Sequence, residues 1–409
     1  MPGAGLDFGS LIWPVETETF FRCYWEKQPL LVTRQTPTYY SGLLSWRDID
    51  TLLHFNRPEV LGAPRAAGTT GLGAPHRDER LFYGNLQQAC QRFARGERFV
   101  IHGLQRYWPP VATLGRHLEQ TLQSPLFGAE LFIAPNDWSG GPPHFDTAAA
   151  FVLQIQGSKH WRLFGPAPQS DQQAATVFVP EEQLGAPLQE FHLEAGDLLY
   201  LPFGHVHQAF TTEESSLHIT VFVRIMRWAD LLSSALACLR RQDSRFWEPL
   251  PPGFLGQETV PTTVLDHWQA LLQAFTANAR AADAVACCAE DFIRNMPLLP
   301  DGRFLSVDHI DHINLDTVVQ KHQGMICRVI QERDTVRIVF PGGQVRGPNK
   351  IASALHYIAG ARDFAVRSLP DDLSADGKLV LARRLLREGL LTIADRGTEP
   401  GVSPRGPCC

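Results

Sequence analysis

The sequence predicts an α+β protein with a β-sandwich or small barrel at its centre. Between residues 129 and 224, short runs rich in apolar and β-branched residues are separated by Gly, Pro and Asp, as in AELFIAP, AFVLQIQ, KHWRLFG, LLYLPFG and SLHITVFV. Short strands at this density are typical of a sandwich or barrel. On both sides of the block, apolar residues recur at helical spacing. The 409 residues are enough for two or three domains.

Helices and one strand are expected before the β-rich block. The stretch 15–27 has aromatic residues at helical spacing, and the QPLLVTR that follows is a strand pattern. Short helices are expected at 45–53 and 109–122. The second begins with Pro, which suits a first helical turn because its missing N–H would have no helical partner there.

Helices dominate the chain beyond Arg224. The stretches 226–241 and 263–295 have helical apolar spacing, and 325–346 is a hairpin pattern that turns at Pro-Gly-Gly. A helix over 349–359 and another from Ser374 to Gly389 follow, the latter with a capping residue at each end. Helices beside a β-ribbon are similar to a winged helix.

Composition argues against two kinds of partner. The formal net charge is -6, from 37 basic and 43 acidic residues. A nucleic-acid binder with a broad basic surface is therefore not expected, because phosphate contacts dominate such affinity. Arg383, Arg384 and Arg387 lie along one predicted helix, and we interpret them as a solvated face. No apolar run approaches the ~20 residues that span a bilayer, so no membrane partner is expected.

The N-terminal stretch and the cysteines indicate a cytoplasmic protein. MPGAGLDFGSLIWPVE has no basic region followed by an apolar one, so it does not have the pattern of a signal peptide. The eight cysteines form neither a CxxC pair nor the spacing of a disulfide scaffold. A reducing compartment is the expected setting.

A pair of polar residues begins a run that otherwise has the pattern of a buried strand. In GGPPHFDTAAAFVLQIQGSKHW, His144 and Asp146 are two residues apart and therefore point to one face of a strand. Later in the block, the stretch GDLLYLPFGHVHQAF contains His207, which is expected at the start of another strand. Two imidazoles and one carboxylate are the facial triad of non-haem Fe(II) oxygenases, which leaves metal positions open for co-substrate and O2.

Other histidines compete for the third position. His205 lies on the same strand parity as His207, so alternation cannot choose between the two. His218 is a weaker rival, whereas His160 and His192 are expected to pack or to face solvent. Zinc accepts the same ligands, and a zinc-hydroxide hydrolase would then be the alternative chemistry.

Lys159 has two interpretations. A straight strand from His144 would carry it about 50 Å away at ~3.3 Å per residue, so the chain has to turn. Corners are available at 147–150 and at Gly157-Ser158. A lysine returned to the barrel would be a costly buried charge unless it met an anion, such as the distal carboxylate of 2-oxoglutarate. Alternatively, it is a surface lysine at a hairpin tip.

These motifs resemble the JmjC-type 2-oxoglutarate/Fe(II) oxygenases, and within them the ribosomal oxygenases, a cupin-like protein hydroxylase branch that acts on ribosomal proteins. The matching stretches are PPHFD, FVLQIQGSKHWRLF, AGDLLYLPFGHVHQA and SLHIT, with FFRCYWEKQPLLV near the N-terminus. The family's Pro-x-Gly-x-x-His-Gln pattern selects His207 over His205. The resemblance implies Fe(II) held by His144, Asp146 and His207, and 2-oxoglutarate paired with Lys159.

The resemblance also implies a domain order. A double-stranded β-helix (jelly-roll, cupin-like JmjC) barrel with flanking helices would occupy 1–225. A helical dimerisation region would follow at 226–298, with Trp228, Leu231, Leu232 and Phe246 as interface residues. A winged-helix-like domain would cover 299–396 and a flexible tail 397–409.

The chain departs from the branch on the strand before the metal motif. Family members tend to have Asn and Tyr on this strand, which here contains Glu130 and Phe132, so the tyrosine hydroxyl of the usual co-substrate hydrogen bonding is missing. Thr220 offers a polar inward group instead. Arginine-hydroxylating bacterial relatives tend to have arginine at the place of Lys159, which favours a histidine acceptor.

The resemblance implies hydroxylation of a histidine or arginine side chain in a ribosomal or other protein. Demethylation of N-methyl-lysine uses the same metal site and is an alternative. A third possibility is a non-catalytic, cupin-like binding protein, against which the complete triad argues.

Overall fold

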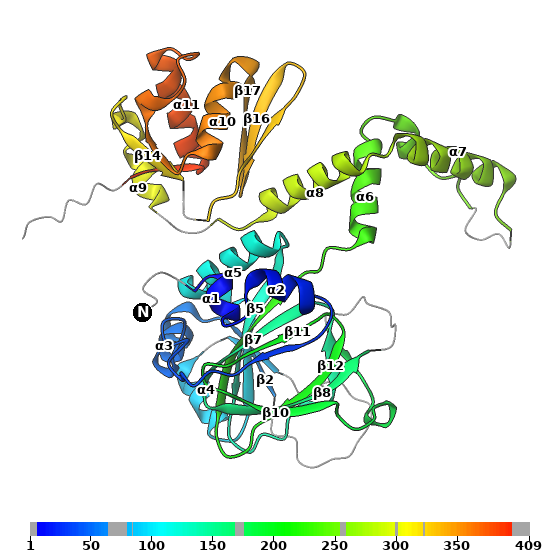
Figure 1. The fold of residues 1–409 in the computed structure, drawn as a ribbon, viewed down its shortest axis with the longest axis vertical. Helices are drawn as coiled ribbons and strands as arrows, with labels where there is room; N and C mark the ends of the chain where they lie inside the picture. The colour runs from blue at the N-terminus through cyan, green and yellow to red at the C-terminus, as the bar shows by residue number, and fades with distance from the viewer. Residues whose placement is uncertain are drawn as a thin grey trace, which may run out of the picture. The chain divides into compact units, whose positions relative to one another are not determined.

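Two antiparallel sheets form the first of the two units into which the chain divides, residues 1–226 and 227–409. The computed structural model in Figure 1 describes residues 6–63, 80–83, 85–167, 176–253, 259–298, 302–321 and 324–394. The expected tail with Cys408 and Cys409 lies outside the described residues.

The strands of the first unit pair only with antiparallel neighbours among the described residues. The larger sheet has the order β1-β11-β7-β13-β5-β4-β2-β3, and the smaller one β10-β8-β12-β6-β9. The strands are β1 (Leu30–Val32), β2 (Glu59–Ala63), β3 (Arg80–Tyr83), β4 (Arg98–Ile101), β5 (Leu126–Ala134), β6 (His144–Asp146), β7 (Ala149–Gln156), β8 (Ser158–Pro166), β9 (Thr176–Phe178), β10 (Gln189–Glu194), β11 (Leu198–Leu201), β12 (His205–Phe210) and β13 (Ser216–Val223).

Helices cover the outer face of the larger sheet (Figure 1). Phe151 and Leu153 of β7 belong to a core that also contains Phe8, Phe20 and Leu114 from three of these helices. The helices of the unit are α1 (Phe8–Ile12), α2 (Thr17–Cys23), α3 (Trp46–Thr51), α4 (Leu86–Phe93) and α5 (Pro109–Leu122).

The inner face of the same strand packs against the smaller sheet. Ala150 and Val152 of β7 share a core with Trp161 and Leu163 of β8 and with Leu193 of β10. Strand β7 is thus covered on both faces, which explains why it is a continuous apolar run rather than an alternating one.

A tight turn at Gly157 reverses the chain from β7 into β8. Its φ is +65°, a left-handed conformation that glycine adopts without strain. A Cβ atom at this position would lie 1.7 Å from the carbonyl oxygen of Ser215, so no other residue fits without backbone movement. This turn brings Lys159 back into the barrel.

Helices α6 (Trp228–Leu239), α7 (Thr262–Asn278) and α8 (Ala281–Asn295) begin the second unit. A disulfide joins Cys238 of α6 to Cys287 of α8. The cysteine spacing did not predict this bond, because the two residues are 49 positions apart and meet only through the packing of the two helices.

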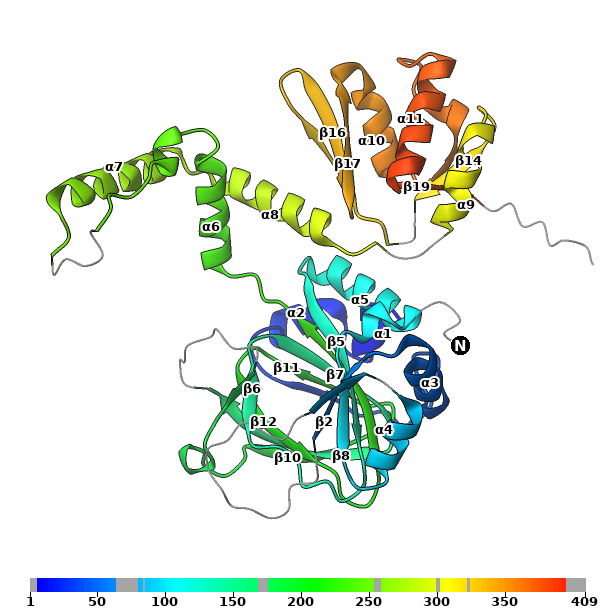
Figure 2. The same ribbon diagram turned by 180° about the vertical axis from the view of Figure 1, so that it is seen from behind.

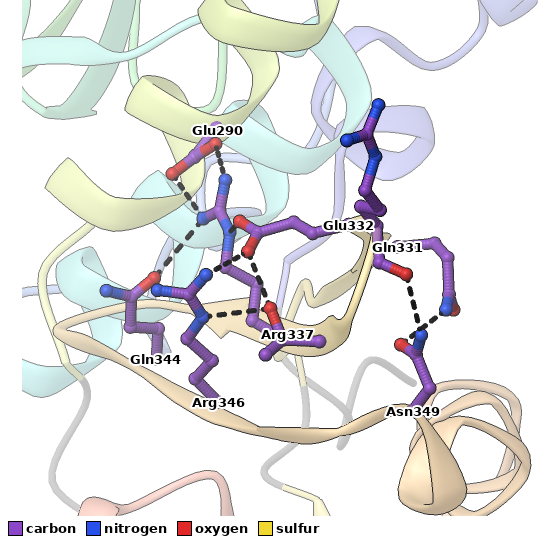
Figure 3. Close-up of polar contacts among 9 residues, drawn as sticks. Glu290, Gln331, Glu332, Arg337, Gln344, Arg346 and Asn349 are labelled. Carbon is purple, nitrogen blue, oxygen red and sulfur yellow. Dashed lines mark hydrogen bonds and ion pairs between the residues drawn. The ribbon is translucent and has the colours of Figure 1, made fainter.

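A charged cluster connects α8 to the C-terminal strands, as Figure 3 shows. Arg337 of β16 donates to both carboxylate oxygens of Glu290 on α8, at 2.6 and 2.8 Å, and to Glu332 at 2.9 Å. Two parallel charge-assisted hydrogen bonds fix the guanidinium in one plane. The Arg337 contact lowers the pKa of the Glu290 carboxyl, as expected for a stabilised carboxylate.

The last part of the unit has two three-stranded sheets, β18-β14-β19 and β15-β16-β17, packed with helices around one core. The Pro-Gly-Gly segment joins β16 to β17, and Ser374 and Gly389 cap α11. The elements are α9 (Arg303–Asp308), β14 (Val318–Lys321), β15 (Arg328–Gln331), β16 (Thr335–Phe340), β17 (Gly343–Pro348), α10 (Ala352–Gly360), β18 (Asp363–Ala365), α11 (Ala375–Glu388) and β19 (Leu391–Ile393). None of the described helices is long and apolar enough to cross a membrane.

We predict that Gly157→Ala destabilises the protein strongly. The left-handed backbone alone costs a non-glycine residue about 1–3 kcal/mol, and the overlap with Ser215 adds to this. Urea unfolding measures the loss. Gly141→Ala is the matched control, because a Cβ there meets no atom within 4 Å. Equal stability of the two variants would contradict the assigned turn.

Candidate active site

Three side chains selected in the sequence converge between the two sheets. His144 and Asp146 are the first and last residues of the short strand β6. His207 lies on β12, which is the neighbour of β6 in the smaller sheet (Figure 2). His207 pairs directly with His144, and their ring centroids are 4.4 Å apart. One ligand atom from each of the three residues lies within 4.8 Å of the others, and no other such group occurs in the part of the chain that the structure describes.

Backbone carbonyls orient both imidazoles. Nδ1 of His144 lies 3.0 Å from the carbonyl oxygen of Pro142, and Nδ1 of His207 lies 2.9 Å from that of His205. A carbonyl oxygen only accepts, so each Nδ1 carries a proton and each Nε2 is the nitrogen whose lone pair is free for a metal in the neutral tautomer. This is the usual arrangement of metal-ligating histidines, in which a hydrogen bond from the other ring nitrogen fixes the tautomer.

The electrostatics of the group keep His207 neutral. Burial, and then the neighbouring His144, lower the pKa of the His207 imidazole. The neutral imidazole is the form that binds a metal. Asp146 lies with Oδ2 at 3.7 Å from Nε2 of His207, and its Oδ1 accepts a hydrogen bond of 2.8 Å from the Thr176 hydroxyl.

The rival histidines are placed elsewhere. His205 stands outside the converging group, and its carbonyl orients His207. The register between β12 and β8 shifts between Val206 and His207, an irregularity that strand alternation could not reveal. His160 and His192 contact each other, with ring nitrogens 3.1 Å apart.

A cavity of about 330 Å³ extends from the three residues to the larger sheet. Thr220 of β13 lines it and is buried. Phe132 of β5 stacks on His218, with ring centroids 4.7 Å apart and planes within 4°. Glu130 faces His102, the residue that follows β4, with Oε1 2.7 Å from Nδ1.

Lys159 is buried in the wall of this cavity rather than exposed at a hairpin tip. Its side chain is surrounded by aromatic rings, with Nζ 5.2 Å from the centroid of Trp138 and 5.9 Å from that of Trp161. No acidic partner of Lys159 is found among the described residues. Burial, and then the charge of Arg98, lower the pKa of the Lys159 ammonium to about 7. The lysine is thus a buried cation without a counter-anion from the described chain.

Several cavity residues carry no signal in the sequence. Arg98 on β4 and His102 just after it lie outside the β-rich block, and Thr176 comes from a strand too short to predict. None belongs to a motif. A His or Arg within a strand pattern was the only sign that these residues could line a cavity. Exposed residues of a strand give the same pattern, so the sign does not identify a site.

We predict that Lys159→Met stabilises the ligand-free protein by roughly 4 kcal/mol at pH 7. The folded-state pKa lies near 7 against an ordinary 10.5, so the protonated lysine opposes folding. This penalty is complete below pH 7, where both states hold the proton, and fades as the pH rises towards 10.5. Urea unfolding at pH 7 and 9.5 should therefore show a shrinking difference. Lys350→Met, at an exposed site, should show none. A variant less stable than the parent at both pH values would show that the lysine is satisfied.

Comparison with known proteins places these residues in a family. Residues 108–231 match the JmjC domain model. Ribosomal oxygenase 1 of Gallus gallus is 34% identical to this chain, over 94% of this chain and 71% of that protein. The bifunctional lysine-specific demethylase and histidyl-hydroxylase NO66 of Aedes aegypti is 35% identical, over 55% of this chain and 36% of that protein.

A solved structure shares the fold. YcfD, a ribosomal oxygenase from Escherichia coli in complex with cobalt and 2-oxoglutarate, superposes with a TM-score of 0.56. The alignment covers 92% of this chain and 98% of that one, at 16% sequence identity. The prediction of a jelly-roll JmjC barrel with flanking helices is confirmed. The chain belongs to the ribosomal oxygenase family of JmjC-domain, 2-oxoglutarate-dependent oxygenases.

Proposed function

We propose that this protein is an Fe(II)- and 2-oxoglutarate-dependent hydroxylase that acts on a side chain of a ribosomal protein. The main support is the convergence of His144, Asp146 and His207 in a cavity that also holds Lys159, a buried amine with no acidic partner among the described residues. The donor set has two imidazole nitrogens and one carboxylate oxygen, which suits Fe(II) and leaves coordination positions for other ligands.

The remaining wall residues would hold the co-substrate. Lys159 is a buried positive charge that an anionic carboxylate would neutralise, and the distal carboxylate of 2-oxoglutarate has this charge. Thr220 would add a hydroxyl contact from the opposite sheet. Aromatic and aliphatic side chains line most of the rest of the cavity and would keep water from the reacting atoms.

When bound, the metal and 2-oxoglutarate supply the oxidation. O2 and 2-oxoglutarate are consumed, succinate and CO2 are released, and one oxygen atom enters a C–H bond of the acceptor. The chain's own side chains position the ligands, exclude water and fix the imidazole tautomers.

The acceptor is proposed from the relatives. Proteins named ribosomal oxygenase and histidyl-hydroxylase match most of the barrel, so a histidine of a ribosomal protein is the favoured acceptor and an arginine the second choice. Demethylation of N-methyl-lysine is an alternative, because the NO66 relative is named for both activities. The complete His-Asp-His group speaks against a non-catalytic binding protein.

We also infer the arrangement of the rest of the chain. The barrel would occupy 1–225, a dimerisation region 226–298 and a winged-helix-like domain 299–396. Nucleic acid is not a proposed partner. Two of the three arginines on α11 are engaged within the protein: Arg383 with backbone carbonyls and Arg384 with Glu388. We propose a cytoplasmic location for the protein.

We predict that anaerobic addition of Fe(II) and 2-oxoglutarate produces a visible metal-to-ligand absorption band. His207→Ala should abolish the band and succinate formation, because a metal with two protein ligands is held weakly. His205→Ala should retain both, since only its backbone carbonyl serves the site. If His205→Ala loses the band and succinate formation while His207→Ala keeps them, His205 and not His207 is the third metal ligand. A folded parent that gives no band would overturn the proposed function.

Product analysis separates the two enzymatic alternatives. We predict that ribosomal proteins incubated with the enzyme gain about 16 Da on a histidine, as one oxygen atom requires. Mass spectrometry of substrates from cells with and without this gene identifies the site. If an N-methyl-lysine peptide releases formaldehyde and no histidine is hydroxylated, the activity is demethylation and the proposed hydroxylation is wrong.

We predict that the full chain is a homodimer held by the helical region. Trp228 and Leu232 of α6 are 81% and 57% exposed, more than an apolar helix face usually shows in a monomer. Replacing both with Asp should convert the dimer to a monomer in sedimentation velocity. Val380→Asp, at another exposed apolar position, should leave the dimer intact. A monomeric parent would overturn this proposal.

A further inference from the structure

One ring nitrogen of His218, deep in the active-site cavity, has no hydrogen-bond partner among the described residues. His218 of β13 lines the cavity and is only 2% exposed. Its Nδ1 is fully buried and makes no hydrogen bond within the described structure. A buried polar atom without a partner costs free energy, so such a group in a native protein calls for an explanation, for example an absent ligand.

Aromatic rings fix the position of this imidazole. Phe132 stacks in parallel on one side, with centroids 4.7 Å apart, and Trp161 meets the ring edge to face at 6.1 Å. These two rings also surround Lys159, with Nζ 5.8 Å from the Phe132 centroid. The imidazole and the ammonium therefore border one corner of the cavity from opposite sheets.

The charged side chains that act on His218 are cationic. Burial, and after it the charges of Lys159 and Arg98, lower the pKa of His218, so its imidazole is neutral. No carboxylate of the described chain raises the pKa of either His218 or Lys159. A neutral imidazole has one N–H to donate, and a cation stands beside it. This combination suits a carboxylate.

We propose that His218 binds the distal carboxylate of 2-oxoglutarate together with Lys159. One ring N–H of His218 donates to a carboxylate oxygen, while the Lys159 ammonium neutralises the charge. Phe132, which cannot donate a hydrogen bond, holds the imidazole plane by stacking. The proposal rests on the proposed function and assigns a donor that the phenyl ring of Phe132 does not provide.

The assignment explains two features at once. It gives the one N–H of the neutral His218 imidazole an acceptor, and it supplies a donor besides the Lys159 ammonium for the two carboxylate oxygens. Thr220 is two residues along β13 and therefore lies on the same face of the strand, so both side chains face the cavity.

The test compares ligands with and without a distal carboxylate. Isothermal titration calorimetry of the full chain, loaded anaerobically with Mn(II), gives dissociation constants for 2-oxoglutarate, succinate and 2-oxopentanoate. His218→Phe keeps an aromatic ring on Phe132 but removes the N–H. We expect it to weaken 2-oxoglutarate and succinate binding about 10-fold or more, the effect of one lost hydrogen bond to a charged group. Binding of 2-oxopentanoate, which has no distal carboxylate, should change less than about threefold.

Two further variants complete the experiment. His218→Gln, which retains an N–H donor, should recover part of the lost affinity. His192→Phe, which removes an exposed imidazole of the same barrel, should bind all three ligands as the parent does. Should His218→Phe fail to fold by circular dichroism, His218→Leu takes its place with the same expected losses.

The outcomes separate the two proposals. If the parent binds Mn(II) and 2-oxoglutarate and the apolar variant binds 2-oxoglutarate equally well, the role of His218 is wrong and the proposed function stands. Equal weakening of 2-oxopentanoate also overturns it, because the effect would then come from the cavity and not from the carboxylate. A folded parent that binds neither metal nor 2-oxoglutarate overturns the proposed function itself.

Discussion

The antiparallel pairing of β6 with β12 is the constraint on which the active site depends. It sets His207 opposite His144, and Asp146 follows on the same face of β6. The two strands lie about sixty residues apart in the chain (207 − 144 = 63) and meet only because the barrel folds back on itself. The smaller sheet therefore carries all three metal-type ligands, whereas the larger sheet supplies the opposite wall.

The alternation of side chains along a β-strand accounts for the part of the site that the sequence could predict. The spacing of His144 and Asp146 needs only strand alternation, and Gly157 marks the turn that returns Lys159. Alternation could not choose between His205 and His207, because they share a parity, and the choice came from the resemblance to a family. In the structure, that choice coincides with a shift in register between β12 and β8.

The remainder of the site could not be predicted for a physical reason. Arg98 on β4 and His102 just after it line the cavity because β4 pairs with β5 and β2 in the larger sheet. Pairings between distant strands depend on the packing of the whole barrel, and nothing in the local sequence encodes them. The same holds for the disulfide of Cys238 and Cys287, which requires two helices to pack.

The cavity also shows how a binding site differs from a core. A core filled only with apolar side chains would be more stable, yet in the part of the chain that the structure describes Lys159 has no counter-ion and Nδ1 of His218 has no hydrogen-bond partner. Both groups cost stability in the ligand-free state. A dianionic ligand would remove both costs together, so binding and stability are linked at this corner. The aromatic rings of Trp138, Phe132 and Trp161 make this possible, because they attract the ammonium weakly and exclude water without neutralising it.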